Sequence, residues 1–551
     1  MSSRTDRRNW VWLPSRLRFR VLGLIDVVAL WVVVSALVGA GAWWGLDAYR
    51  DSRDYCTENQ ELRRVDTAAG EECIGVTAEA YAFDPDLADV MGRIEGENKA
   101  ARKSGKPVVS VAVMMPYTST TPGAAMSKEL IRHALQGAYV AQYGHNHGAA
   151  TDGTAVQLLF ANVGEDLTQW KTVTGELAAR RTGKAPLVAA IGFPNSDTAT
   201  LESVQKGLGH KEVRIPAVSA VLSSREMEHS YLFKVSPSTD QLVDALKRYV
   251  IENEVNRKDT FLIADEQDDN YVENLRKVFL EEFGEEYGIR TDDAVGRRIA
   301  VYRGSKGSDR GDAQDFRQAV DAMCAAGVKT VFLAGRDADL RPFLETLDHR
   351  SPCDWGTDAE PLRILRVSTG RDPVTESPRM RQIAERNHIE IVTAAAVDAP
   401  RWVAGSGGDE EVPRFFGDFA ASYGQYFSGE DAAALNDGYA VMYHDALTAV
   451  GTAVAAAQGG QDNPVDHDDV YDALRRGSPS ERCVGCVPGA SGVFTFVDEN
   501  IGLDKGARNE AVVGRWPVCK PVPVVTFPKE RQDKSPLYRT YQGRGEACPP
   551  P

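Results

Sequence analysis

Two cysteines three residues apart, Cys483 and Cys486, have the spacing of a redox-active pair or of half a zinc site. A thioredoxin-type pair needs its first cysteine at the N-terminus of a helix that follows a strand. Here Pro488 and Gly489 follow, and neither a second such pair nor a nearby pair of histidines completes a zinc site. A structural disulfide is the favoured interpretation. An extracytoplasmic thiol-disulfide enzyme that uses these two cysteines stays as an alternative.

The chain contains eight cysteines, an even number that favours disulfides if the protein lies outside the cytoplasm. Spacing alone leaves the connectivity open. Proximity along the chain suggests four pairs: Cys56 with Cys73, Cys324 with Cys353, Cys483 with Cys486, and Cys519 with Cys548.

No other group of residues predicts catalysis. The nine histidines are scattered, with His145 and His147 in what should be a solvated loop, and no HExxH helix could hold zinc. There is no GxSxG motif and no phosphate-binding loop, and the glycine-rich segment 405–408 has no strand before it. We therefore expect a protein that is not an enzyme and that uses no metal or cofactor.

The composition is that of an acidic globular protein. Hydrophobic residues make up 43% of the 551 residues, enough for two compact lobes, each with its own core. The formal net charge is −16, whereas a protein that binds duplex nucleic acid needs a basic face. We therefore expect no nucleic-acid partner.

Residues 21–46 form an apolar run long enough to cross a bilayer. Only Asp26 interrupts the run, close to its start, and Trp43 and Trp44 suit the opposite interface. Six arginines precede the run and mixed charges follow it, so residues 1–20 should be a cytoplasmic basic segment and the rest extracytoplasmic. A cleaved signal peptide is the alternative, but its apolar core has only about 7 to 15 residues. We expect an uncleaved signal anchor in the cell membrane.

Beyond residue 106, strand-like apolar runs alternate with amphipathic helical stretches. The runs are residues 108–115, 156–162, 187–192, 260–265 and 328–335. Between the first two, Ile131, Ala134, Leu135 and Ala138 have helical spacing, and Ser127 can cap that helix. Repeated β-α-β units predict an α/β fold with parallel sheets, in which ligands bind beyond the carboxyl ends of the strands.

Several motifs follow one another in a characteristic order. They include VSVAVMMPYTSTTPGAA, AAIGFPNSDTAT, IPAVSAVLSS, YLFKVSPSTDQ, DEQDDNYVENL and GASGVFTFVDENIG. Together they resemble the type I periplasmic-binding-protein superfamily, in particular the branched-chain amino-acid and amide receptors of ABC importers. The resemblance covers roughly residues 107–516.

This resemblance implies two Rossmann-like lobes, joined by hinge strands, that close on a ligand between them. The boundaries would be 107–236 and 396–497 for lobe 1, and 237–395 and 498–517 for lobe 2. Two flanks lie outside the resemblance. Residues 47–106 would form an extracytoplasmic stalk with one helix after Pro85. Residues 518–551 would form a proline-rich tail that runs extended over the surface.

The resemblance also assigns ligand-binding residues. Serine and threonine hydroxyls and free N–H groups at the start of a helix would hold an anionic group of the ligand, although serine and aspartate also cap helices without any ligand. Lobe 2 would add the ring of a tyrosine, which could equally be a packing residue. The candidates are Ser196, Asp197, Thr198, Ser223 and Ser224, then Tyr271 from lobe 2, and Tyr117, Thr118 and Ser119 from the first loop.

The sequence leaves open the charge of the protein wall that faces the ligand amine in amino-acid receptors. Arg336 and Arg371 stand where those receptors often use an acid or an aromatic group. A shift of one residue would put Asp337 or Asp372 there instead. We expect a small polar ligand, amino-acid-like or amide-like.

The resemblance implies a partner in the membrane. A receptor for amino-acid transport would deliver its ligand to an ABC permease. An anchored sensor not coupled to transport would need a signalling membrane protein, because the cytoplasmic stretch of about twenty residues holds no signalling domain.

Overall fold

The computed structural model describes most of the chain between residues 54 and 528. The described residues are 29–36, 54–57, 59–121, 124–148, 153–255, 259–267, 269–289, 298–304, 316–349, 353, 355–371, 375, 377–405, 412–430, 432–458, 464–477, 483, 485–496, 515–528, 537–539 and 548. The chain divides into two compact units, residues 1–64 and residues 65–551.

In the first unit, residues 29–36 are helical and expose Leu30 and Trp31. No helix in the described part of the chain is long and apolar enough to cross a bilayer. The remainder of the expected span 21–46, and the basic segment 1–20 before it, lie outside the described residues.

The first sheet has, among the described residues, seven strands in the order β1-β2-β4-β3-β5-β6-β7. Their bounds are β1 Leu62–Thr67, β2 Gly70–Thr77, β3 Val108–Met115, β4 Ala155–Asn162, β5 Leu187–Gly192, β6 Ala217–Ser219 and β7 Leu232–Lys234. Strands β3 to β7 run parallel, and β2 joins β4 antiparallel. The predicted runs 108–115 and 187–192 are strands with these bounds.

Helices cover both faces of this sheet. They are α2 Ala88–Lys103, α3 Lys128–His147, α4 Trp170–Ala179, α5 Thr198–Glu202, α12 Ala399–Gly405, α13 Phe416–Tyr426, α14 Tyr439–Gln458 and α15 His467–Arg475, with the helical turns η1 Pro85–Leu87, η2 Ser203–Leu208 and η3 Ala432–Leu435. The Ser127 hydroxyl accepts the N–H of Leu130 at 3.3 Å and so caps α3 as predicted. At its other end α3 extends to His147, so His145 and His147 lie in its last turn and not in the expected loop.

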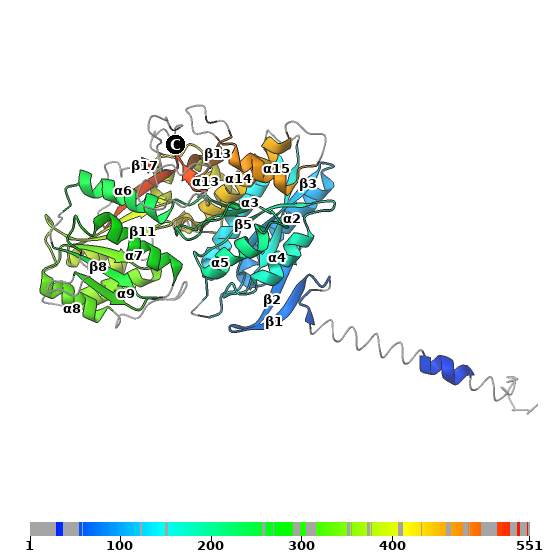
Figure 1. The fold of residues 1–551 in the computed structure, drawn as a ribbon, viewed down its shortest axis with the longest axis horizontal. Helices are drawn as coiled ribbons and strands as arrows, with labels where there is room; N and C mark the ends of the chain where they lie inside the picture. Colours follow the sequence, from blue (N-terminus) through cyan, green and yellow to red (C-terminus); the bar gives the residue numbers. More distant parts are fainter. Residues whose placement is uncertain are drawn as a thin grey trace, which may run out of the picture. The chain divides into compact units, whose positions relative to one another are not determined.

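The second sheet has the order β17-β16-β12-β11-β10-β8-β9 within the described residues. Its strands are β8 Thr260–Asp265, β9 Ile299–Tyr302, β10 Thr330–Ala334, β11 Leu362–Ser368, β12 Ile389–Ala395, β16 Pro521–Phe527 and β17 Leu537–Arg539. Its helices are α6 Thr239–Glu252, α7 Asn270–Phe283, α8 Arg317–Ala326, α9 Asp337–Asp348 and α11 Pro378–Arg386. Figure 1 shows α7, α8 and α9 around this sheet.

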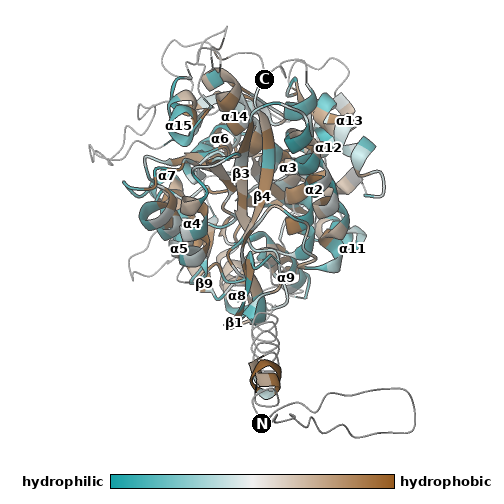
Figure 2. Ribbon diagram, turned by 90° about the vertical axis from the view of Figure 1, so that its right-hand side faces the viewer, coloured by the Kyte–Doolittle hydropathy of each residue, from teal (hydrophilic) through white to brown (hydrophobic). Residues whose placement is uncertain are grey.

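Each sheet is buried on both faces, and its central strands consist mainly of apolar residues, with single polar positions such as Ser110 in β3 and Arg366 in β11. Along β3, Val111 and Val113 belong to one core cluster, and Ala112 and Met114 to the cluster on the opposite face. In the second sheet, the neighbours Phe261 and Leu262 separate in the same way. Figure 2 shows β3 and β4 in the colours of hydrophobic residues.

The chain passes between the two sheets at three described places. After β7 it enters α6, which packs on β11, β12 and β16. After β12 it enters α12, whose Trp402 lies in a core cluster of the first sheet. The third passage joins β15 (Pro517–Val518) to β16. Strand β15 belongs to a small sheet with β13 (Val487–Gly489) and β14 (Gly492–Phe496), whereas β16 pairs with β12.

The two flanks differ from the expected stalk and tail. Ile74 of β2 is buried in a core cluster, and so are Val90 and Ile94 of α2, the helix expected after Pro85. At the other end, β16 is buried along its whole length and pairs antiparallel with β12. The sequence pattern does not predict this strand, because prolines alternate with valines in its first half. Proline cannot donate a ladder hydrogen bond and usually marks a non-strand segment.

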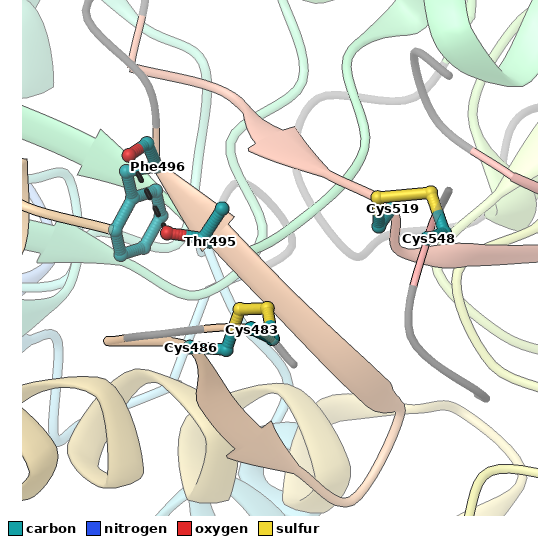
Figure 3. The surroundings of a disulfide bond; sticks show 6 residues. All are labelled: Cys483, Cys486, Thr495, Phe496, Cys519 and Cys548. Carbon is teal, nitrogen blue, oxygen red and sulfur yellow. Dashed lines mark hydrogen bonds between the residues drawn. A yellow bond between two sulfur atoms is a disulfide. The ribbon is translucent and has the colours of Figure 1, made fainter. Parts of the chain in front are cut away.

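Three of the four expected disulfides are present as pairs: Cys324–Cys353, Cys483–Cys486 and Cys519–Cys548. Figure 3 shows the last two. Cys56 and Cys73 are each disulfide-bonded as well. The strand β13 follows Cys486, so within the described residues this pair does not open a helix as a thioredoxin-type motif would.

Candidate functional site

The order of the strands determines where a ligand could bind at the carboxyl edge of each sheet. In the first sheet the chain leaves β3 toward β4 and leaves β5 toward β6, in opposite directions, although β3 and β5 are neighbours. In the second sheet β8 and β10 form the same kind of switch point. Loops that diverge in this way leave space for a ligand beyond the carboxyl ends of the strands. The candidate residues Ser196, Tyr271 and Arg336 follow β5, β8 and β10.

The turn after β5 is held by its backbone. Gly192 has φ +114°, and a Cβ there would lie 2.6 Å from the Met114 carbonyl oxygen, so the position requires glycine. Ser196 follows and is buried, and its hydroxyl oxygen accepts the N–H groups of Ser223 and Ser224, each at 3.3 Å. The hydroxyl proton of Ser196 stays available to donate to a ligand.

The other candidates in this turn have local partners or are exposed. Asp197 accepts the N–H of Ala199 at 2.6 Å and caps the short helix α5. Thr198 is exposed. Both observations match the capping alternative, which needs no ligand.

The serine turn, formed by Ser223 and Ser224, contacts the second sheet. The Ser224 hydroxyl lies 2.6 Å from Oε2 of Glu226 and 3.0 Å from the carbonyl oxygen of Asn270, the first residue of α7. The carbonyl of Ser223 accepts the N–H of Thr239 at 2.8 Å. The serine turn therefore contacts the segment that carries Tyr271.

Tyr271 and Arg336 lie together at the second switch point. Oδ1 of Asp269 caps α7 by accepting the N–H of Tyr271 at 2.9 Å, and Oδ2 forms an ion pair with Arg336. The Arg336 guanidinium lies 5.5 Å from the centre of the Tyr271 ring. Burial opposes the charge of Arg336, but Asp269 and Tyr271 outweigh burial and raise the pKa of this arginine.

The other charged candidates also have partners inside the protein. Asp337 forms an ion pair with Arg366 and accepts the Ser368 hydroxyl at 2.9 Å. Nε of Arg371 lies 3.0 Å from Oδ1 of the fully buried Asp398. Asp372, the alternative to Arg371, lies outside the described residues.

Tyr439, which the sequence analysis did not single out, joins this group from α14. The N–H of Arg371, in the loop after β11, donates to the carbonyl oxygen of Asn436 at 2.7 Å, so the start of α14 lies against the second sheet. Burial raises the pKa of Tyr439, the carboxylates of Asp337 and Asp437 add to the increase, and Arg336 counteracts it. Tyr271 contributes to the same shift. The segment DGYAVMY carries two tyrosines at helical i, i+4 spacing directly after a glycine, and this pattern could have indicated an aromatic wall.

The first loop is part of the packing of the first sheet. Tyr117 is fully buried in a core cluster, and its hydroxyl donates to the carbonyl of Val113 at 2.8 Å. The Thr118 hydroxyl donates to Oε2 of Glu72 at 2.6 Å. The structure thus brings together the serines, Tyr271 and Arg336, and places Tyr117 apart in the core.

Comparison with solved structures identifies the fold. A solute-binding protein of an ABC transporter from Rhodopseudomonas palustris HaA2, in complex with p-hydroxybenzoic acid, is 16% identical, with 80% of this chain and 98% of that chain covered at a TM-score of 0.51. Its counterpart from strain BisB5, in complex with 3,4-dihydroxybenzoic acid, is 14% identical, with 81% and 99% covered at 0.51. A leucine-binding protein from Thermotoga maritima is 16% identical, with 78% and 98% covered at 0.47.

The chain therefore has the α/β fold of the type I periplasmic binding proteins, the fold of the substrate-binding proteins of ABC transporters. The similarity is in the fold: no family model matches the sequence, and neither does any of the curated proteins.

Proposed function

We propose that this protein is a solute-binding protein that holds a small polar ligand between the residues at its two switch points. The observation that carries the proposal is that Tyr271 and Arg336, which follow strands of the second sheet, lie together beside the turn after β6, whose Ser224 hydroxyl is 3.0 Å from the carbonyl oxygen of Asn270. Tyr439, from a helix that covers the first sheet, interacts electrostatically with both Tyr271 and Arg336. Ser196 and Ser224 supply hydroxyls from the neighbouring turns. Binding would draw the two sheets together through the three passages of the chain.

The molecules bound in similar solved structures support a small ligand. Two of those proteins are in complex with p-hydroxybenzoic acid and 3,4-dihydroxybenzoic acid, each a single small molecule. We infer an amino-acid-like or amide-like ligand, and a role as the receptor of an ABC importer. We also propose that residues 21–46 anchor the protein in the membrane, with the large domain outside the cytoplasm.

Binding can be tested without knowing the ligand in advance. Native mass spectrometry of the purified protein should detect a bound small molecule, and calorimetric titration should then measure its affinity. Tyr271→Ala should weaken binding by about ten-fold or more, because it removes a ring contact and a hydroxyl. Equal affinity in Tyr271→Ala and in the parent protein would show that the ligand lies elsewhere.

The control is Tyr231→Ala. Tyr231 contacts Arg214 and stacks on Tyr471, and none of these belongs to the proposed site, so this variant should bind as tightly as the parent.

An importer's receptor and an anchored sensor differ in what they do with the ligand. Uptake of the labelled ligand by cells should fall when the gene for this protein is deleted if the protein delivers its ligand to a permease. Unchanged uptake would favour the sensor.

A further inference from the structure

Two tyrosine hydroxyls at the proposed site have no hydrogen-bond partner in the described part of the protein. The N–H of Tyr271 donates to Asp269 and the N–H of Tyr439 donates to Asp437, but neither hydroxyl forms a hydrogen bond with a described residue. Both rings are partly buried. These two hydroxyls come from elements of different sheets, and each is available to a ligand.

A third tyrosine adds a fully buried hydroxyl. Tyr443 lies one turn after Tyr439 on α14, and the centres of the two rings are 6.4 Å apart with an interplanar angle of 20°. The Tyr443 hydroxyl has no partner among the described residues, although the residue is fully buried. Such a group is rare in folded proteins, because burying it without a hydrogen bond costs free energy.

Charged side chains near these rings already form ion pairs within the protein. Arg336 is paired with Asp269, Asp337 with Arg366, and Arg371 with Asp398. Arg336 and Arg371 are largely buried, whereas the Asp337 side chain keeps 47% of its surface exposed. A charged group on the ligand would have to displace one of these partners or lie in a partly buried site without a counter-charge. Both are unfavourable.

We propose that the ligand is uncharged where it meets Tyr271 and Tyr439, and that the hydroxyls of these two tyrosines select it by hydrogen bonding. The ligand class is therefore a small neutral molecule with an amide, ketone or hydroxyl group, in preference to an amino acid or a carboxylate. This inference rests on the proposed function and narrows it.

The neutral tyrosine hydroxyl suits this task because it both donates and accepts. An amide group has an oxygen acceptor and N–H donors, so it can engage two tyrosine hydroxyls at once. A site that hydrogen-bonds a polar group discriminates strongly against molecules that cannot satisfy it.

The test uses matched pairs of probes that differ only in charge: p-hydroxybenzamide with p-hydroxybenzoate, and isocaproamide with isocaproate. The affinities are measured by calorimetric titration of the full-length protein. The amide that binds more tightly should bind at least about ten-fold more tightly than the acid of the same pair. Affinity for the amide should not depend on ionic strength. Tighter binding of the acids, or of leucine, would overturn this inference and leave the proposed solute-binding function intact.

Two variants at the tyrosines localise the selection. Tyr439→Phe and Tyr271→Phe should each lower the affinity for the amide by about ten-fold and leave the melting temperature of the empty protein unchanged, because neither hydroxyl has a described partner to lose. The control Tyr231→Phe removes a hydroxyl that accepts from Arg214 outside the site and should not alter binding. Unchanged affinity in both site variants would overturn the assignment.

A third variant tests the role of charge matching. Asp269→Asn preserves the cap of α7, since asparagine caps as well as aspartate, but removes the partner of Arg336. The unmatched arginine should then favour the acids and shrink or reverse the preference for the amides. An unchanged preference would contradict the inference.

If no probe binds, the molecule released from the purified protein decides the question. A neutral molecule supports the inference and a charged one overturns it. If no molecule is released and no probe binds, the proposed function fails together with the inference.

Discussion

At the scale of single residues, the buried lysine at the first passage between the sheets is the least expected feature. Lys234 is fully buried at the end of β7, and its Nζ has no hydrogen-bond partner among the described residues. Nζ lies 4.1 Å from the centre of the Trp516 ring. Burial lowers the pKa of Lys234 to about 7, although Glu228 partly opposes this effect and Arg515 adds to it.

This lysine predicts how stability changes with pH. Below about pH 7 the lysine is charged in both the folded and the unfolded state, and the folded state carries the full cost of burying the charge. As the pH rises from about 7 toward the ordinary value of 10.5, the unfolded chain binds more protons, so the free energy of unfolding rises. Lys234→Met should raise stability at neutral pH by several kcal/mol and flatten this rise, measured by urea unfolding. Lys99→Met, at an exposed ion pair, serves as the control and should leave the slope unchanged.

A second prediction concerns Ser196. Because its hydroxyl oxygen accepts two backbone N–H groups, Ser196→Ala should leave both without this partner and lower the free energy of unfolding by about 1 to 3 kcal/mol. Thr198→Ala, two residues away and exposed, should change it by less than about 0.5 kcal/mol. Equal unfolding midpoints for these variants would mean that Ser196 does not hold the serine turn.

At the scale of elements, the C-terminal strand β16 completes the second sheet. Val522 and Val524 belong to the same core cluster as Leu365 of β11 and Val392 of β12. The residues just before β16 are fixed as well, by the Cys519–Cys548 disulfide and by Lys520, whose Nζ lies 3.5 Å from Oδ2 of Asp445 in α14. This segment is therefore structural, although its sequence is typical of a tail.

A substitution in β16 should show this directly. Val524→Asp places a carboxylate in an apolar core without a partner, and it should lower the free energy of unfolding by roughly 3 to 5 kcal/mol. The matched control is Val403→Asp, because Val403 of α12 is 51% exposed. Thermal melting of both variants decides the matter. If Val524→Asp and the control have the same melting temperature, β16 does not pack as described.

At the scale of the whole molecule, the proposed anchor predicts which parts of the chain are accessible. Protease added to intact cells should degrade the large domain and spare a short N-terminal fragment, because the arginine-rich residues 1–20 favour the cytoplasm. Lysed cells treated in the same way are the control. Protection of the large domain in intact cells would refute the proposed topology.

The sequence by itself determined the alternation of elements, because strands buried on both faces are continuous apolar runs and can be recognised locally. Residues 108–115, 187–192 and 260–265 are strands with those bounds, and Ser127 caps α3. Proximity along the chain was likewise sufficient for three disulfide pairs, which close short loops.

Only the tertiary structure decided what these elements bring together. The role of Tyr439 depends on the start of α14 lying against the loop after β11, where the N–H of Arg371 donates to the carbonyl oxygen of Asn436 at 2.7 Å. These residues are more than sixty positions apart in the chain, and no local pattern records their contact. The charge of the site depends on which carboxylate each arginine meets, and the pairs Arg336–Asp269 and Arg371–Asp398 join separate elements. The strand β16 owes its burial to β12, because alternating proline and valine acquire a partner only when two distant segments meet.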